Sequence, residues 1–421
     1  MSIFLIMSAG LLGVVRTNNK YTLQKEAQNH SLEIAEAGVN YYHWHLAHNP
    51  YDYSDGTGGA DCSPEEPYTC GPYTHDYLND SGQKIGGFEL EITPPPAGST
   101  IIIINSTGWV DKFPLVKRTI STRFGIPSLA EYLFLENSQM NFSPTSETWG
   151  KVHSNRKIQF NGTNHSTVES AQNGNGVWGT GGPQDLWHWP VPEIDFNKVT
   201  QDLSLIKAEA IANGIFIANS GDDGYHLVLK ADESVDIYMV TRLWWPRSNY
   251  NIRNETFLEN RSLEDIHTVF IEDDFWIEGT VTGLLTIASA RFPDNPNTNT
   301  TIYILDNIIY ETKDKYHVLG LIAQKDVILT RGVPDTLNIE AHLIAQKGSI
   351  YRLCYWFDLK DSLTLYGSLI SKKPGGFKCG DPVTAGFVDT YYYPNPNAIY
   401  YPPPMFPITT TSTIISWEEI E

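Results

Sequence analysis

The sequence predicts a mainly β protein with a long N-terminal α-helix, then a small region of strands, and finally a β-helix-like C-terminal domain of stacked coils. A helical apolar pattern crosses the start of the chain, where no proline occurs before Pro50. Beyond residue 149, short apolar runs recur between Gly and Asn turns, as strands do. One motif, LIAQK, occurs twice in this part. These features together predict one long helix and a strand-rich remainder.

The length of 421 residues suits two or three domains of about 100–200 residues each. We predict an N-terminal membrane or filament helix at 1–50, a strand region with a cysteine loop at 51–126, a β-helix-like head at 149–385, and a C-terminal arm rich in Pro and Tyr at 386–421. The net charge of −20 comes without a long basic run. Because nucleic-acid affinity depends on clustered Lys and Arg, we expect no nucleic-acid partner.

The N-terminal helix changes character along its length. Residues 3–15, IFLIMSAGLLGVV, form an apolar run of 13 residues, shorter than the roughly 20 that span a membrane. A polar stretch follows, and from Leu32 the apolar face widens to about half of the helix. We expect the first part to lie in lipid or in a filament core and the last part to pack on a domain. The side chains expected to be buried by the first part are Leu5, Leu11, Leu12 and Val15.

Four cysteines stand in two irregular segments and favour disulfides. Cys62 and Cys70 are eight residues apart in a loop rich in Pro and Gly, and Cys354 and Cys379 flank a second loop. Neither pair has the close ligand spacing of a zinc site. Free thiols remain the alternative, and four cysteines allow three connectivities.

The stacked-coil prediction for the head depends on a repeat. LIAQK occurs at 321–325 and 343–347, 22 residues apart, and the related SLIS around Leu369 comes 26 residues after Leu343. A period of 20–25 residues built of short strands is typical of β-helix coils. A β-sandwich with long hairpins is the alternative. One further helix is predicted within 193–214, and we expect the C-terminal arm to be anchored by Ile414, Ile415 and Trp417.

The sequence offers little catalytic chemistry, so we predict a protein that is not an enzyme and needs no cofactor or metal. His43, His45 and His48 do not share one helix face. The acidic turns at 221–224 and 272–274 lack the spacing of a calcium loop. The alternative is a secreted β-helix protein that binds or degrades polysaccharide. Its candidate residues are the carboxylates Asp273 and Glu278 and the sugar-stacking aromatics Trp178, Trp187, Trp189, Trp244 and Trp245.

Two parts of the sequence resemble a known family. The segment SLEIAEAGVNYYHWHLAHNP at 31–50 contains an Ala-Glu-Ala-Gly motif at Ala35, Glu36, Ala37 and Gly38. It resembles the end of the N-terminal helix in type IV pilin-like proteins, particularly PilX-type minor pilins. INSTGWVDKFPLVKRTI at 104–120 resembles the strand pair that follows that helix, so the resemblance covers about the first 125 residues. The segments from WGKVHSN to SLISKKPGGFK also resemble the C-terminal region of large PilX-like surface proteins.

The resemblance implies a structural role, in which a pilin-like strand region carries a large head. Expected partners are other pilin subunits or inner-membrane assembly proteins, the membrane through the N-terminal helix, and a surface glycan. The expected location is the cell surface, by membrane anchoring or in an extracellular filament. The expected role is filament assembly or adhesion.

Overall fold

The computed structural model describes residues 2–49, 52–59, 62–63, 68–96, 98–380, 382–409 and 412–420, without the side chains at 2–10, 12 and 197–202. The chain forms two compact units. Unit 1 comprises Met1–Pro127 and Thr409–Glu421, and unit 2 comprises Ser128–Ile408. Unit 2 is therefore inserted, in sequence, between two parts of unit 1.

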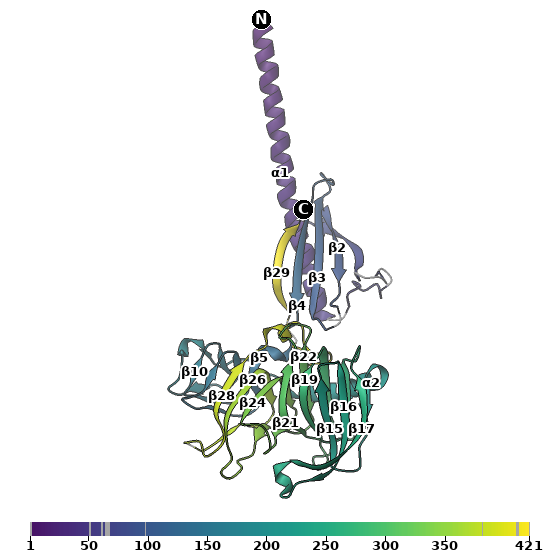
Figure 1. The fold of residues 1–421 in the computed structure, drawn as a ribbon. Helices are drawn as coiled ribbons and strands as arrows, with labels where there is room; N and C mark the ends of the chain where they lie inside the picture. The colour runs from purple at the N-terminus through teal and green to yellow at the C-terminus, as the bar shows by residue number, and fades with distance from the viewer. Residues whose placement is uncertain are drawn as a thin grey trace. The chain divides into compact units, whose positions relative to one another are not determined.

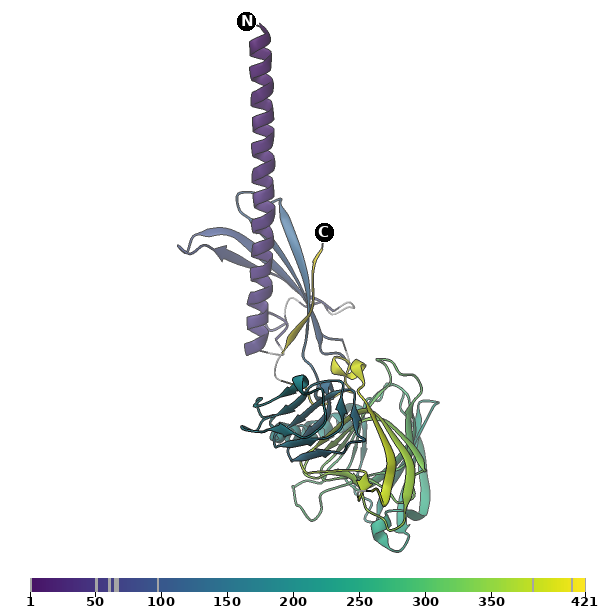
Figure 2. The ribbon, with the colours of Figure 1, turned by 90° about the vertical axis from the view of Figure 1, so that its left-hand side faces the viewer.

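Unit 1 consists of one long helix, α1 (Ser2–His48), and a five-stranded antiparallel sheet with the order β1-β2-β3-β4-β29. Figures 1 and 2 show the sheet lying along the C-terminal half of α1, while the N-terminal half extends beyond it. The strands are β1 (Cys70–Leu78), β2 (Lys84–Thr93), β3 (Ile101–Val110), β4 (Lys117–Gly125) and β29 (Thr413–Ile420). The last strand comes from the far end of the chain and pairs with β4.

The widening apolar face of α1 is the face that packs on the sheet, as the sequence predicts. Its buried side chains recur at helical spacing and are Ala27, Ile34, Ala35, Val39, Tyr42 and Leu46. All of them except Ala27 share a core with alternate residues of β2, β3 and β4. In β3 the burial alternates, so that Ile102 and Ile104 face the helix while Ile101 and Ile103 are half-buried. This alternation is the expected pattern of a strand with one covered face.

Unit 2 is built mainly from parallel strands, and we call its longest run of paired strands the long ladder. In spatial order the long ladder comprises β14 (Ile215–Ile217), β18 (Thr268–Ile271), β20 (Leu284–Ser289), β22 (Val318–Ala323), β24 (Thr336–Ala345), β26 (Leu359–Ser371), β5 (Tyr132–Glu136), β8 (Lys151–Ser154), β11 (Val168–Ser170) and β13 (Trp187–His188). Every neighbouring pair in it is parallel.

Further parallel ladders run beside the long one. One comprises β15 (Gly224–Lys230), β19 (Phe275–Val281), β21 (Ile302–Tyr310), β23 (Val327–Leu329) and β25 (Ile350–Arg352). A short one comprises β6 (Met140–Phe142), β9 (Ile158–Phe160) and β12 (Val177–Trp178). A third joins β26 to β28 (Ala385–Tyr393), β7 (Glu147–Thr148) and β10 (Thr163–Asn164). The apolar side chains between the ladders form one continuous core.

The remaining elements flank these ladders. α2 (Phe196–Asn213) lies within the predicted range of 193–214 and packs against β14 and β18. β16 (Ser234–Leu243) and β17 (Ile252–Ser262) form an antiparallel hairpin beside β15, and β27 (Lys378–Cys379) pairs with β28. Short 3-10 helices are η1 (Leu129–Glu131), η2 (Gln184–Leu186), η3 (Arg247–Asn249) and η4 (Pro396–Ile399).

The LIAQK repeat marks stacked strands in register. Leu321 of β22 is the pairing partner of Leu343 in β24, and Leu343 in turn pairs with Leu369 of β26. All three leucines point into the core. The sequence separations of 22 and 26 residues are therefore the lengths of chain between successive strands of the long ladder.

The unit boundaries differ from the predicted domains. The head begins at Ser128 rather than at 149, because β5 pairs with β26, more than 200 residues later in the chain, and no local signal marks such a pairing. The predicted C-terminal arm is divided, since residues up to Ile408 belong to unit 2 and β29 belongs to unit 1. The expected anchors Ile414, Ile415 and Trp417 lie in β29 with much of their surface exposed.

Candidate functional site

The pilin-like motif lies at the point where α1 comes closest to its sheet. Ala35 is fully buried, and a Cβ added to Gly38 would lie 2.3 Å from Ser106 Oγ. On the facing strand, a Cβ on Gly108 would lie 2.2 Å from the carbonyl oxygen of Ser31 and 2.5 Å from the amide of Ala35. Such distances leave no room for any side chain. The small residues therefore let the backbones of α1 and β3 approach each other.

The other two motif residues face away from this contact. Glu36 is exposed and Ala37 is half-buried. The motif thus packs α1 against the sheet through one helix face, and Glu36 lies on the opposite, accessible face.

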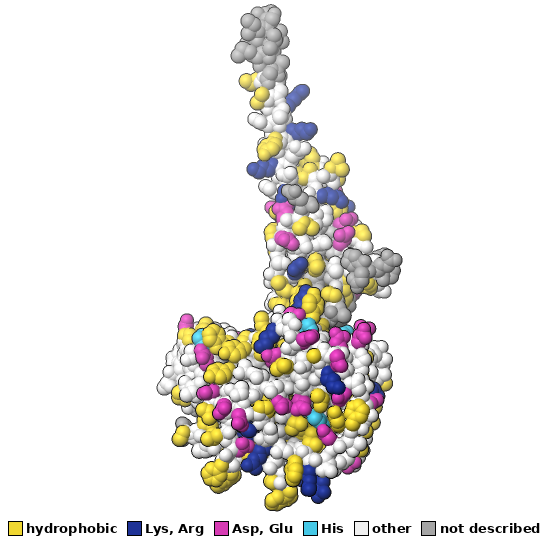
Figure 3. Space-filling view, in the orientation of Figure 1, with side chains coloured by type: hydrophobic (Ala, Val, Ile, Leu, Met, Phe, Trp, Pro, Cys, Tyr) yellow, Lys and Arg dark blue, Asp and Glu magenta, His cyan; other side chains and the backbone are white. Residues whose placement is uncertain are grey.

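The N-terminal part of α1 presents apolar side chains that are exposed. Leu11 keeps 71% of its surface exposed and Tyr21 keeps 67%, and Val14 and Val15 are exposed as well. Figure 3 shows such apolar groups, interspersed with Lys and Arg, along the projecting helix. The side chains of Leu5 and Leu12, two of the predicted membrane or filament residues, fall outside the described part. Within the described ranges, no helix combines the length and apolarity needed to cross a membrane.

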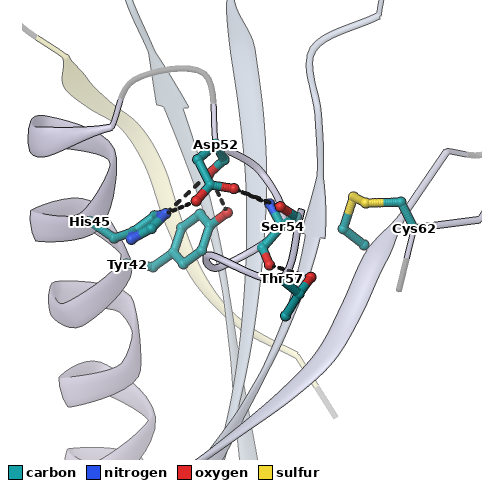
Figure 4. Close-up of a disulfide and its surroundings, with 7 residues drawn as sticks. Tyr42, His45, Asp52, Ser54, Thr57 and Cys62 are labelled. Atoms are coloured by element: carbon teal, nitrogen blue, oxygen red, sulfur yellow. Dashed lines mark hydrogen bonds and ion pairs between the residues drawn. A yellow bond between two sulfur atoms is a disulfide. The ribbon is translucent and has the colours of Figure 1, made fainter. Parts of the chain in front are cut away.

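The C-terminal end of α1 is held to the turn that follows it by Asp52. Asp52 accepts hydrogen bonds from the amide and hydroxyl of Ser54 at 2.9 and 2.7 Å, and from the Gly56 amide at 2.9 Å. His45 of α1 lies 3.2 Å from the Asp52 carboxylate, as Figure 4 shows. Burial raises the pKa of Asp52, but these hydrogen bonds and His45 outweigh it and lower the pKa below its ordinary value.

Asp55 links α1 to β1. Its carboxylate accepts a hydrogen bond from the Tyr41 hydroxyl at 3.0 Å and lies 2.7 Å from Nε2 of His75. Burial and the carboxylate of Asp55 raise the pKa of Tyr41 to about 12, so the phenol stays protonated and donates. The turn after α1 thus ties the helix to the sheet through side chains on both.

Both disulfides that the sequence favoured are present. Cys62 pairs with Cys70 at the start of β1, beside the Asp52 turn (Figure 4), and Cys354 pairs with Cys379 in unit 2. The first bridge joins two residues that are eight apart in the sequence. The second bridge links the loop after β25 to β27.

The candidate metal and catalytic residues do not converge. His43 contacts Ser412, His45 contacts Asp52, and His48 contacts the carbonyl of Trp44. No group of three or more His, Cys, Asp or Glu side chains in the described part of the chain is placed to hold a metal ion. Asp273 is buried in contact with Arg291 and Ser220, whereas Glu278 lies 3.5 Å from Nε2 of His226. The two candidate carboxylates thus have different partners.

The tryptophans singled out for sugar stacking are dispersed. Trp187 is buried in the core, Trp178 is half-buried, and Trp189 is exposed near β13. Trp244 and Trp245 lie together in the loop between β16 and β17. Only this last pair belongs to an exposed aromatic surface.

That surface is the aromatic loop cluster, formed by the loops at 244–251, 330–333 and 353–358. The Tyr355 hydroxyl donates to the Ser248 carbonyl at 3.2 Å, and the Arg331 amide donates to the Asn249 carbonyl at 3.0 Å. Trp245, Trp356 and Phe357 are 87%, 83% and 92% exposed. The sequence analysis missed Trp356 and Phe357. Their position directly after Cys354, in a loop that a disulfide was expected to restrain, could have indicated them.

Comparison with known proteins gives only weak structural likeness. No family model matches the sequence, and no curated protein matches it. Among solved structures, the chain is similar to the competence-associated pilin ComZ from Thermus thermophilus, with 11% sequence identity and a TM-score of 0.32, over 94% of this chain and 97% of that chain. At this level the likeness carries no argument about function, which must come from the residues of this chain.

Proposed function

We propose that this chain is a type IV pilus-associated subunit of the minor-pilin kind, which acts by assembly and display rather than by catalysis. The observation that carries the proposal is the division of α1. Its C-terminal half is buried on an antiparallel sheet through the Ala35–Gly38 motif, and its N-terminal half presents apolar side chains to a partner.

The exposed half of α1 supports association because its side chains gain stability only when they are covered. Each fully buried Leu or Val contributes about 1.5–3 kcal/mol relative to its exposed state. A filament core made of neighbouring helices provides that cover, and so does the membrane before assembly. Gly13, whose added Cβ would have nothing within 4 Å, allows another helix to approach closely.

Charged substitutions on the helix test this proposal. We expect the Leu11→Lys, Val15→Lys double variant to reduce recovery in sheared surface filaments and in membranes by about tenfold or more, since two buried positions become charged. Leu115→Lys is the matched control, because Leu115 is 96% exposed in the turn between β3 and β4. Unchanged recovery of the helix variant, or an equal loss with Leu115→Lys, would contradict the proposed role.

For unit 2 we infer a β-helix architecture that displays surface loops. The uninterrupted parallel pairing of the long ladder and the inward leucines at LIAQK support it. A stacked scaffold of this kind holds loops rigidly at its rim, which suits a protein whose role is contact with a surface.

A second function, adhesion to surface glycans, is favoured by the aromatic loop cluster. Exposed Trp and Phe side chains on loops fixed by hydrogen bonds and a disulfide offer flat apolar contacts at little cost in ordering. We expect cells that produce the Trp245→Ala, Trp356→Ala double variant to lose attachment to glycan-coated surfaces while keeping their filaments. Trp149→Ala is the control, since Trp149 is also exposed in unit 2 but stacks on His165. Equal attachment by both variants would argue against this function.

A further inference from the structure

A carboxyl group interrupts a column of small side chains inside unit 2. The final residues of neighbouring strands in the long ladder pair in register, in the order Ala323, Ala345, Ser371, Glu136, Ser154 and Ser170. All except Glu136 are Ala or Ser and are almost completely buried. Glu136 alone carries a long acidic side chain at this level of the stack.

Two strand edges line the same cavity as Glu136. β6 is the edge strand of the sheet β12-β9-β6, and the neighbouring ladder ends where Gly376 bridges to Tyr351 of β25. Both edges line a cavity of about 250 Å³, and Glu136 lines it as well. The large polar side chain of the column thus lies at a cavity in the wall of unit 2.

The lining combines aromatic and uncharged polar groups. Phe134 packs edge-on against Phe142 and Tyr392, with ring centroids 5.2 and 4.9 Å apart, and all three line the cavity. Asn141 and Thr390 add an amide and a hydroxyl. Apolar walls with a few polar groups are typical of small-molecule sites.

We propose that this cavity binds a single neutral sugar ring, with Glu136 hydrogen-bonded to its hydroxyls. The volume admits one ring rather than a chain of them. The aromatic side takes the apolar face of the ring, and Glu136, Asn141 and Thr390 take its hydroxyls. This site is separate from the aromatic loop cluster and does not depend on assembly into a filament.

The charges of the site disfavour a cationic ligand. The Glu136 carboxylate accepts a hydrogen bond from Ser138 at 2.8 Å, and within the described residues it forms no ion pair. Burial raises its pKa to about 8, which the Ser138 hydrogen bond only partly opposes. At neutral pH the group is therefore mainly protonated, so that it donates as well as accepts. The protonated Glu136 carries no charge that would attract a cation, and Lys378, another lining residue, would repel one.

Binding of simple glycosides to the full chain tests the proposal. The probes are methyl α-glucopyranoside, methyl β-galactopyranoside and N-acetylglucosamine, measured by saturation-transfer NMR and titration at neutral pH. Glu136→Ser restores the small side chain of the column and so keeps the stack, whereas Glu136→Gln keeps a donor and an acceptor. Glu259→Ser, at an exposed position on β17, is the matched control.

We expect at least one probe to bind the wild type, with affinity reduced about tenfold or more in Glu136→Ser because the hydroxyl partner is lost. Glu136→Gln and Glu259→Ser should bind within about threefold of the wild type. The proposal is overturned if no probe binds, if Glu136→Ser binds as well as the wild type, or if methylamine or acetate binds at Glu136 in place of the sugars. Far-UV circular dichroism of Glu136→Ser separates loss of the ligand contact from loss of the fold.

Discussion

At the scale of single residues, the contact between α1 and β3 depends on positions where a side chain has no space. Gly108 faces the helix backbone itself, so a methyl group there meets atoms that cannot rotate away. Gly38 instead faces the side chains of Ser106 and Phe88. The neighbours of Gly38 can therefore move to reduce a steric clash with an added side chain, whereas the neighbours of Gly108 cannot.

We expect Gly108→Ala to destabilise unit 1 by about 1–3 kcal/mol, the usual cost of overpacking a core. The control is Gly13→Ala, which adds a methyl group in open space on α1 and should leave unit 1 at least as stable. Urea unfolding followed at the methyl NMR signals of Ile34 and Ile104 reports on unit 1 alone. A Gly108→Ala protein as stable as Gly13→Ala would show that α1 is not closely packed at this point.

The Asp52 turn gives unit 1 a defined dependence on pH. The pKa of Asp52 is lowered in the folded state, so its contribution to stability is present above the unfolded pKa of about 3.9 and is lost as the pH falls through the folded value. Asp52→Asn should therefore cost about 1–2 kcal/mol at neutral pH, because charged hydrogen bonds to Ser54 and Gly56 are weakened.

The difference between Asp52→Asn and the wild type should shrink between about pH 4 and pH 2, where the wild-type carboxylate is protonated. The same methyl signals in a urea titration measure it. Asp80→Asn is the control, since Asp80 is exposed at the β1–β2 turn. If the difference in stability between the two proteins stays constant across this range, the charge of Asp52 does not contribute to the stability of unit 1.

At the scale of elements, the sequence predicted what depends on local pattern. The half of α1 with the wider apolar face is the half that packs on the sheet. α2 lies within the range that its apolar residues and Gly214 predicted. Leu321, Leu343 and Leu369 lie in register on neighbouring strands. Each of these signals is contained in one segment or in a short repeat. The segment 129–136, for which no element was predicted, contains both η1 and β5.

What the sequence did not predict depends on pairing between distant segments. β5 stacks on β26, and β29 joins β4, although each pair is separated by more than 200 residues. Glu136 looks ordinary in the sequence, because only this distant register places it in a column of Ala and Ser. Its importance could not be derived without the fold.

We expect each disulfide to restrain only the loop that it closes. The Cys62–Cys70 ring contributes about 2–3 kcal/mol on the loop-entropy model. Cys62→Ser, Cys70→Ser should raise proteolytic cleavage within 52–63 while leaving unit 2 unchanged. Cys354→Ser, Cys379→Ser is the matched pair and should loosen the loop at 353–358 instead. Mass spectrometry of the cleavage sites tests this prediction. Equal effects of both double variants on cleavage within 52–63 would contradict the prediction that each disulfide restrains only its own loop.

At the scale of the whole molecule, the chain leaves the sheet of unit 1 after β4 and returns to it as β29. Gly125 of β4 pairs with Thr413 of β29, and the Thr409 amide donates to the Pro127 carbonyl at 2.8 Å. Within unit 2, Ser128 and Ile408 also pair. Both ends of the inserted segment are thus adjacent, as in a hairpin whose loop has been replaced by a domain.

This arrangement predicts that each unit folds without the other. Replacing Ser128–Ile408 with a two-residue Asn-Gly turn should leave an ordinary antiparallel hairpin between β4 and β29, because a turn of that kind joins strands in the existing register. Unit 1 made in this way should keep the methyl NMR signals of Ile34 and Ile104 at their positions in the full chain, and Ser128–Ile408 alone should keep its β-type circular dichroism. A matched deletion that also removes Thr413–Ile420 should expose the edge of β4 and cause association, since an unpaired strand edge is a template for another chain. If the Asn-Gly protein does not fold although unit 2 does, β4 and β29 need the inserted unit to find their register, and the sheet of unit 1 is then a product of the whole chain.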